Sequence, residues 1–421
     1  MHVILFEDQS VVNLYPVTVG RAAFSISVGS MRLINIAKEL GAQIELVARP
    51  HLRAVLRADV PESWSPDKGE RKGPILLINA RTVPECLLKG LWKELVSREY
   101  ERGAVVFSGS SIAAAVLNTP DMLPNRELGC AELQGILQDL DLPIVYPSRQ
   151  IELLERPSDV IRFHMKIIGA NLEHRISTGY YREIMDGVFV PKDESVAPKI
   201  GDYFVSDTKS GPIILSPNVQ IGPYCLIRGP VYIGPRSKVI EHAAIKDEVA
   251  ISSVCKIGGE VEATTIEPYS NKQHHGFLGH SYLGSWVNLG AGTCNSDLKN
   301  SYNEVSQETP SGKFPSGMQF LGCVIGDYSK TAINTSIFTG KTIGACSMTY
   351  GFVTTAVPSF VNYARSFGQI TEIPADLMIQ TQERMFARRD VRQRPCDMQL
   401  IRDMFELTRS ERQLASEPLS L

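Results

Sequence analysis

Residues 215–257 read LSPNVQIGPYCLIRGPVYIGPRSKVIEHAAIKDEVAISSVCKI, and every sixth residue from Leu215 to Ile257 is aliphatic. From Val219 onward, the residue two positions before each aliphatic one is small or β-branched. A six-residue period fits neither the 3.6-residue turn of a helix nor the alternation of a half-buried strand. It is typical of a hexapeptide β-helix, in which three hexapeptides form one triangular coil. We therefore expect the aliphatic side chains to point into a prism and the small ones to fill its corners.

The hexapeptide period also has breaks. It slips around residues 269–276, resumes with Leu278, Leu283 and Leu289, and fails again over 294–320. A long excursion from a compact repeat is often functional. The period returns at Ile325, Thr331, Ile337 and Ile343. Beyond residue 357 the pattern becomes helical, over 375–388 and 397–409, and predicts a tail that caps the solenoid.

The first 155 residues have the pattern of an α/β domain. Short apolar runs predict strands at residues 3–6, 44–47, 75–78 and 105–107. Two helices are predicted to end at a glycine, residues 32–40 before Gly41 and residues 84–102 before Gly103. The alternation predicts a mostly parallel sheet. Ser158 is the expected N-cap of a helix over 159–172.

These patterns divide the chain into four predicted segments. They are an α/β domain (1–155), a connector helix with an irregular linker (156–210), a left-handed β-helix domain (211–356) and a helical tail (357–421).

Composition limits the class of protein. The hydrophobic content is 43%, the charged content is 21% and the net charge is −3, which gives no argument for nucleic acid or an anionic membrane. The N-terminus lacks the pattern of a signal peptide, and no apolar run is long enough for a membrane span. The eight cysteines show no CxxC spacing. We expect a cytoplasmic protein without a structural metal site of that kind.

The densest polar stretch follows the slip of the period. Residues 274–293 read HHGFLGHSYLGSWVNLGAGT and hold three of the chain's eight histidines within seven residues. This run resembles the acetyltransferase domain of GlmU-like bifunctional sugar-1-phosphate nucleotidyltransferases, with the pattern HLTYLGxxxIGxxVNIGAGT. Residues 326–334 and the Ser316-Gly317 loop resemble archaeal members with dual activities. The YSNKQH motif at 269–274 is shared with a group described as sugar nucleotidyltransferases.

The resemblance implies roles for individual residues. His274 falls on the family's general base, which takes a proton from the amine of an amino-sugar phosphate as it attacks acetyl-CoA. Asn288 falls on a sugar contact, and Ala291 and Asn334 fall on the acetyl-CoA site. Phe277 stands where the family has a tyrosine. An alternative alignment makes His280 the base and Tyr282 that tyrosine.

The family also holds the sugar phosphate with basic residues. Arg228 matches by local sequence, and Lys246, 18 residues later, is expected to stack on it in the next coil. Lys272 and Lys313 are further candidates, although a solvated surface lysine is an equally good interpretation of each.

The N-terminal segment departs from the family. Phe6 is followed by Glu7, Asp8, Gln9 and Ser10 instead of a glycine-rich phosphate loop. Asn79 follows the third strand where a metal-binding aspartate is usual, and Arg21 stands near the family's phosphate-binding lysine. Glu7 and Asp8 could hold Mg²⁺ for a nucleoside triphosphate, or could simply be solvated or capping carboxylates.

The sequence thus predicts a homotrimeric acetyl-CoA-dependent acetyltransferase of an amino-sugar-1-phosphate, with a divergent nucleotidyltransferase domain that could be inactive. Two alternatives remain open. One is a zinc hydratase of the γ-carbonic-anhydrase type, with His242, His275 and His280 as ligands. The other is a non-catalytic protein that binds sugar nucleotides.

Overall fold

The computed structural model describes residues 1–86, 88–97 and 100–415. They form two compact units. The α/β unit contains Met1–Leu14, Arg21–Ile26 and Met31–Glu155, and the β-helix unit contains Tyr15–Gly20, Ser27–Ser30 and the chain from Arg156 onward.

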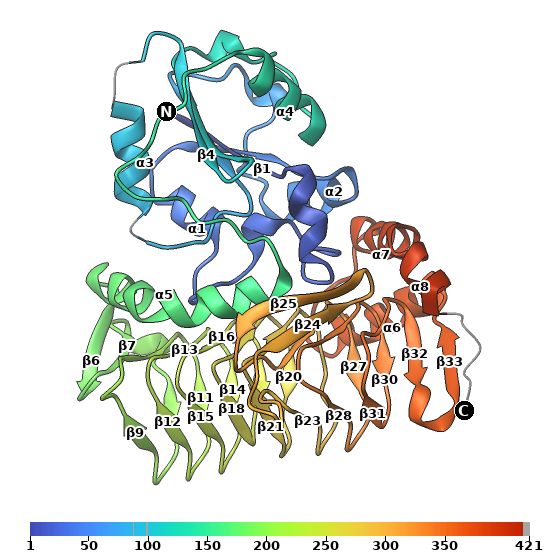
Figure 1. Cartoon of the computed structure of the whole chain (residues 1–421). Helices are drawn as coiled ribbons and strands as arrows, with labels where there is room; N and C mark the ends of the chain where they lie inside the picture. Colours follow the sequence, from blue (N-terminus) through green and yellow to red (C-terminus); the bar gives the residue numbers. More distant parts are fainter. Residues whose placement is uncertain (87, 98–99, 416–421) are drawn as a thin grey trace. The chain divides into compact units, whose positions relative to one another are not determined.

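The α/β unit has one five-stranded sheet in the order β2-β1-β3-β5-β4 (Figure 1). Its strands are β1 (His2–Phe6), β2 (Gln43–Val47), β3 (Ile75–Asn79), β4 (Gly103–Ser108) and β5 (Ser111–Leu117). The four predicted strands are present. The prediction of a mostly parallel sheet is confirmed, because β1, β2, β3 and β4 run in the same direction. Strand β5 was not predicted, and it pairs antiparallel with both β3 and β4. The sequence SIAAAVL of β5 gives little strand signal, since alanine has low strand propensity.

Helices of the α/β unit are α1 (Leu33–Lys38), α2 (Arg53–Asp59), α3 (Leu88–Ser97) and α4 (Cys130–Asp139), with short 3-10 turns at Gln9–Leu14, Ala23–Ser25, Pro50–Leu52, Pro66–Lys68 and Pro120–Met122. Gly41 has the expected positive φ of 66° after α1. The helix predicted over 84–102 is shorter than expected, and its positions 87, 98 and 99 lie outside the described residues. Gly103 opens β4 and pairs with Leu117, so it is not a helix cap.

Helix α5 (Pro157–Ser177) opens the β-helix unit. Its N-cap is Arg156, whose amide donates to the Asp159 carboxylate at 2.9 Å, so the prediction of Ser158 as N-cap is wrong. The Ser158 amide instead donates to the side chain of Gln307. Figure 1 shows α5 running beside the strands of the β-helix. Ile168 and Leu172 of α5 are buried together with Ile214 and Ala250 of the β-helix.

The β-helix has three faces, each a ladder of short parallel strands. The first face contains β7 (Val188–Pro191), β10 (Ile213–Leu215), β13 (Val231–Ile233), β16 (Val249–Ile251), β19 (Thr265–Ile266), β22 (Tyr282–Leu283), β26 (Cys323–Ile325) and β29 (Lys341–Ile343), with β6 (Tyr181–Met185) at its edge. The second face contains β8 (Lys199–Ile200), β11 (Gln220–Ile221), β14 (Lys238–Val239), β17 (Lys256–Ile257) and β20 (Asn271–Lys272), and continues through Asn288 to β27 (Lys330–Thr331), β30 (Met348–Thr349), β32 (Val361–Ala364) and β33 (Gln369–Glu372).

The third face contains β9 (Val205–Asp207), β12 (Leu226–Arg228), β15 (Ala244–Lys246), β18 (Glu260–Glu262) and β21 (Phe277–Gly279), and then β23 (Cys294–Asn295), β28 (Ser336–Ile337) and β31 (Phe352–Val353). The first coil is formed by β7, β8 and β9, which pair with β10, β11 and β12. The β-helix therefore begins one coil before residue 211. A 3-10 turn at Glu194–Val196 interrupts that first coil and obscures the hexapeptide period there.

The hexapeptide residues form the core of the β-helix, as the period predicts. All eight aliphatic positions from Leu215 to Ile257 are at most 4% exposed, and they join one continuous apolar cluster. The small residues from Val219 to Cys255 are buried with them. At Lys272 the coil is shorter, because Ile257 pairs with Lys272 after 15 residues instead of 18. The shortening begins earlier, since Ala244 pairs with Glu260 after 16 residues and Ala250 with Thr265 after 15. The slip seen in the sequence at 269–276 therefore lies after the point at which the coil loses residues.

The excursion predicted over 294–320 contains a β-hairpin, and its first two residues belong to β23 of the third face. Strands β24 (Val305–Thr309) and β25 (Gly312–Met318) pair antiparallel, and Glu308 of β24 lies beside Lys341 of the first face.

The tail contains helices α6 (Ala375–Ala387), α7 (Pro395–Leu407) and α8 (Arg409–Ala415), which confirms the two predicted helices within two residues at each end. A 3-10 turn at Arg365–Phe367 precedes them. Figure 1 shows these helices at the C-terminal end of the β-helix. Among the described helices, none has the length and apolarity needed to cross a bilayer.

Candidate functional site

A cavity of about 520 Å³ lies on the second face of the β-helix, next to the end of α6. It brings together three of the predicted site residues, His274, Asn288 and Ala291. The other lining residues are Lys256, Tyr269, Asn271, Gln273, Trp286, Leu289, Gly290, Lys330, Ile333, Met385, Arg388 and Arg389. We call this space the second-face cavity.

The floor of the cavity is a ladder of outward side chains on successive coils. Lys256 pairs with Asn271, Asn271 with Asn288, and Asn288 with Lys330. The Asn271 amide donates to Asn288 Oδ1 at 3.3 Å. His274 is the second residue after β20, at the corner where the chain turns toward the third face, and its side chain is exposed. The shortened coil thus places an accessible imidazole beside two amides.

Aromatic rings form one wall. Tyr269 and Trp286 occupy the same corner on successive coils and stack with centroids 4.2 Å apart and planes 2° apart. Phe386 of α6 packs on Trp286 at 4.5 Å. Flat apolar walls of this kind suit the faces of sugars and other ligands that carry both apolar and polar groups.

Lysine 272 is not available to a ligand. It takes an aliphatic position of the period, is 2% exposed, and donates from Nζ to the carbonyl oxygen of His274 at 2.7 Å. Burial lowers its pKa to about 8. Lys272 therefore braces the backbone of the turn that carries His274, and its prediction as a phosphate ligand is wrong.

Lysine 330 lies deeper in the same wall. Its Nζ donates to the carbonyl oxygen of Tyr328 at 3.0 Å and lies 2.8 Å from the sulfur of Met385. Burial lowers its pKa to about 8. Asn334 is exposed and lies near Ala291, since its backbone N–H donates to the Ala291 carbonyl oxygen at 2.7 Å. Asn334 does not line the cavity itself.

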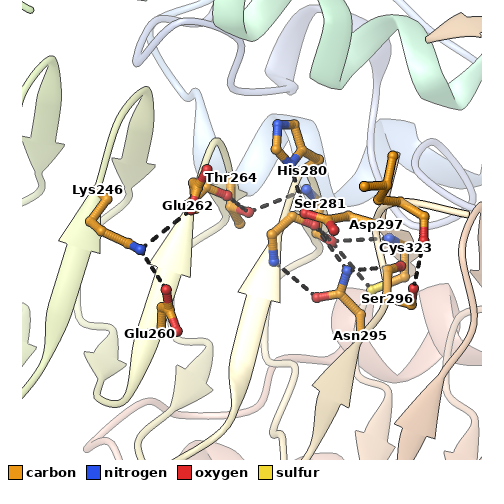
Figure 2. A network of polar contacts seen from close by, with 12 residues as sticks. Lys246, Glu260, Glu262, Thr264, His280, Ser281, Asn295, Ser296, Asp297 and Cys323 are labelled. Atoms are coloured by element: carbon orange, nitrogen blue, oxygen red, sulfur yellow. Dashed lines mark hydrogen bonds and ion pairs between the residues drawn. The ribbon is translucent and has the colours of Figure 1, made fainter. Parts of the chain in front are cut away.

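Both cations predicted from the third face are held by carboxylates. Lys246 pairs with Arg228 in the next coil, as the 18-residue spacing predicts. Figure 2 shows Lys246 Nζ between Glu260, at 2.5 Å, and Glu262, at 3.5 Å. Arg228 lies 3.5 Å from Asp207 and 3.4 Å from Asp247. Their charges are largely neutralised, and neither residue lines the second-face cavity.

Three other predicted contacts lie elsewhere. Phe277 is on the third face, where its ring lies close to Gly279. Tyr282 is fully buried on the first face and donates to Glu267 at 3.3 Å. Lys313 is exposed on β25. Tyr282 is wrongly predicted as a substrate contact, because the outward position of a first-face strand is covered there.

His280 lies at the next corner, between the third and first faces. Its Nδ1 is 2.8 Å from Asp297 Oδ2 (Figure 2). Its ring stacks on Phe320 with the ring centroids 5.2 Å apart. It does not line the second-face cavity. His242, another zinc candidate, stacks on Tyr224. Within the described part of the chain, no group of three potential metal ligands comes together.

In the α/β unit, the two carboxylates after β1 are both paired with arginine. Buried Glu7 accepts from Arg49 Nε at 3.0 Å and from the amide of Ala23 at 3.0 Å. Buried Asp8 accepts from Arg81 Nε at 2.8 Å and from Asn79 at 2.9 Å. Carboxylates held this way do not fit Mg²⁺, which needs free oxygen ligands. Arg21 is partly buried beside them, and its carbonyl oxygen accepts from Arg49.

The cavity also contains residues that the sequence did not indicate. Lys256 could have been predicted from the sequence, because the register of the coils places it beside Asn271 on the outside of the second face. Arg388 and Arg389 carry no such signal, because their place depends on how the tail folds back.

The fold joins an α/β unit with one five-stranded sheet to a hexapeptide-repeat β-helix. Residues 3–177 match the family described as sugar nucleotidyl transferase. The chain is 34% identical over 140 residues to the bifunctional protein GlmU of Synechococcus elongatus, covering 32% of this chain and 27% of that protein. It is 35% identical over 97 residues to a bifunctional sugar-1-phosphate nucleotidylyltransferase/acetyltransferase of Sulfurisphaera tokodaii, covering 23% and 24%.

A third relative, the putative uncharacterized acetyltransferase YaiX of Escherichia coli, is 29% identical over 147 residues, covering 34% of this chain and 64% of that protein. The chain therefore spans about a quarter of the length of the two bifunctional relatives. These matches confirm the resemblance to the GlmU-like transferases.

Proposed function

We propose that the β-helix unit transfers an acetyl group from acetyl-CoA to the amine of an amino-sugar-1-phosphate. The observation that carries this proposal is the second-face cavity, which joins His274, Asn288 and Ala291 in one ligand-sized space. The resemblance to GlmU-like transferases supplies the reaction class.

In this reaction the amine nitrogen attacks the thioester carbonyl carbon, the C–S bond breaks, and coenzyme A leaves as the thiolate, which then takes up a proton. His274 takes the proton that the nitrogen loses. An imidazole suits this step, because its ordinary pKa lies near neutral pH. Asn288 holds a sugar hydroxyl, and Ala291 lies against the thioester end of the cofactor.

We favour His274 over His280 as the base because His274 lines the cavity and His280 does not. His280 nevertheless has one property of a general base that favours it, because the carboxylate of Asp297 orients its ring. The experiment below therefore includes both histidines.

For the α/β unit we propose a role in binding a sugar nucleotide, without nucleotidyl transfer through Glu7 or Asp8. Both carboxylates are already paired with arginine, so they do not provide the metal ligands that phosphoryl chemistry needs. We further propose a homotrimer in the cytoplasm, the arrangement that the GlmU resemblance implies.

The test is an assay of thiol release from acetyl-CoA with glucosamine-1-phosphate and related amino-sugar phosphates. We expect wild type to be active and His274→Ala to lose about 100-fold or more in kcat, as for removal of a general base. His242→Ala is the matched control, an exposed histidine two coils earlier that lies outside the cavity.

Retained turnover in His274→Ala together with loss in His280→Ala would move the base to the His280–Asp297 pair. Binding of the ligands without turnover in wild type would favour the non-catalytic alternative. Stoichiometric zinc in the purified protein would favour the hydratase.

A further inference from the structure

The second-face cavity is strongly basic. Four of its lining residues are lysine or arginine, and none of its described lining residues is aspartate or glutamate. Among the described residues, Lys256 and Arg388 have no ion-pair partner, in contrast to Arg228 and Lys246 on the third face. Cations gathered in a concave space without carboxylates repel one another, so the free protein has an unfavourable charge arrangement there.

The positions of these cations come from two separate parts of the chain. Lys256 is on β17 and lies between Lys238 and Asn271 in the outward ladder of the second face. Arg388 and Arg389 follow α6 directly. Arg389 Nη2 donates to Asn271 Oδ1 at 2.6 Å, which anchors the end of α6 to the coil that carries His274. The contact of Phe386 with Trp286 holds the same segment from the other side.

The mutual repulsion acts on the side chains themselves. Burial lowers the pKa of Lys256, and the nearby charges of Arg389, Lys238 and Arg388 lower it further. Burial also lowers the pKa of Arg389, and the charge of Arg388 adds to that effect. A bound anion would remove this repulsion, so the cluster gains more from an anion than isolated surface cations would.

We propose that Lys256, Arg388 and Arg389 bind a phosphate group of the ligand that occupies the second-face cavity. Phosphate recognition then lies on the second face and includes the chain's own tail, whereas Arg228 and Lys246 are occupied by carboxylates. Arginine presents its donors as a planar fork that matches phosphate oxygens, and the lysine adds a point charge. The proposal names the ligand group within the site proposed above, but the cation cluster does not depend on acetyl transfer.

Two ligands of the proposed reaction carry such a group. One is the amino-sugar phosphate, and the other is coenzyme A with its 3′-phosphate and diphosphate. Removing the phosphate from one ligand at a time separates these sources.

The experiment is calorimetric titration of the full chain with five probes. They are acetyl-CoA, 3′-dephospho-acetyl-CoA, acetyl-pantetheine, glucosamine-1-phosphate and glucosamine. Wild type is compared with the double variant Lys256→Gln/Arg388→Gln and with Arg392→Gln. Arg392 is an exposed cation on the same tail and does not line the cavity, so it controls for the loss of charge. Arg389 is kept, because it also anchors α6.

We expect the double variant to bind one phosphorylated probe about 10- to 100-fold more weakly than wild type, with Arg392→Gln unchanged. The matching probe without its phosphate should bind wild type and the double variant equally weakly. This pattern with glucosamine-1-phosphate assigns the cluster to the sugar. If the double variant binds acetyl-CoA more weakly but binds 3′-dephospho-acetyl-CoA as well as wild type does, the cluster holds the 3′-phosphate. If the difference between the two proteins persists with 3′-dephospho-acetyl-CoA and disappears only with acetyl-pantetheine, the cluster holds the diphosphate.

Equal affinity of wild type and the double variant for every phosphorylated probe overturns the proposal, as does an equal loss in Arg392→Gln. So does the absence of binding of any phosphorylated probe to wild type. Acetyl transfer with unchanged kinetic constants in the double variant would leave the proposed function standing and reject the phosphate subsite. Phosphate-dependent binding without any acetyl transfer would do the reverse.

Discussion

His164 shows how a single buried side chain ties the β-helix unit together. The Gly29 amide donates to its Nδ1 at 3.1 Å, so the ring proton is on Nε2, which lies 2.5 Å from the Glu248 carbonyl oxygen. The side chain is fully buried, and burial lowers its pKa from 6.5 to about 4. The fold therefore requires a neutral imidazole at this position.

This requirement predicts a dependence of stability on pH. The unfolded chain binds a proton at His164 below pH 6.5, whereas the folded chain does so only near pH 4. The free energy of unfolding therefore keeps its full value above pH 6.5 and falls as the pH drops from 6.5 to 4, with a total loss of roughly 3 kcal/mol from His164. Urea denaturation at several pH values should show this slope in wild type and a smaller one in His164→Gln.

The control for His164 is His242→Gln, which removes an exposed histidine of the same unit and should leave the slope unchanged. An equal slope in wild type and His164→Gln would show that other groups cause the acid sensitivity.

At the scale of elements, the hairpin β24–β25 is inserted between two coils of the β-helix, and β22 still pairs with β26 on either side of it. The chain returns from the hairpin at Gly322, where the amide donates to the His280 carbonyl oxygen. A Cβ built on Gly322 would lie 2.1 Å from the Gly279 carbonyl oxygen and 2.3 Å from Ser281 Oγ. Only glycine allows the two coils to approach this closely.

We therefore expect Gly322→Ala to destabilise the β-helix unit by about 1–3 kcal/mol, because the backbone has to shift at a packed coil. Gly169→Ala in α5 is the matched change, since nothing lies within 4 Å of its added Cβ. That control should stabilise the helix by about 0.5–1 kcal/mol. Thermal unfolding measures both, and similar melting temperatures for the two variants would contradict the steric argument.

For the whole molecule, the division into two compact units predicts two unfolding transitions. Arg81→Met should destabilise only the α/β unit, by about 3–5 kcal/mol, and so lower the temperature of its transition, because it leaves the buried carboxylate of Asp8 without its arginine partner. Scanning calorimetry of the full chain tests this against Gly322→Ala, which should lower only the other transition. A single transition that both variants shift equally would mean that the units unfold together.

Much of the architecture could be predicted from local patterns. The hexapeptide period identified the β-helix and its core, and the slip at 269–276 identified the turn that carries His274. Predictions failed where the same residue type occurs in more than one structural environment, such as lysine at the surface or in the interior and alanine in a helix or a strand. Lys272 was predicted to be a surface cation and fills an interior position, and the antiparallel β5 is hidden in an alanine-rich run.

The sequence by itself determined the coil, because the period is a property of each hexapeptide and its immediate neighbours. Only the tertiary structure decided which cations are free to bind a ligand. Arg228 and Lys246 are neutralised by carboxylates, whereas Lys256 and Arg388 have no ion-pair partner among the described residues. The tail is brought to this cavity by the hydrogen bond from Arg389 to Asn271, which lies 118 positions earlier in the chain. Charge pairing acts through space, so a local pattern does not contain it.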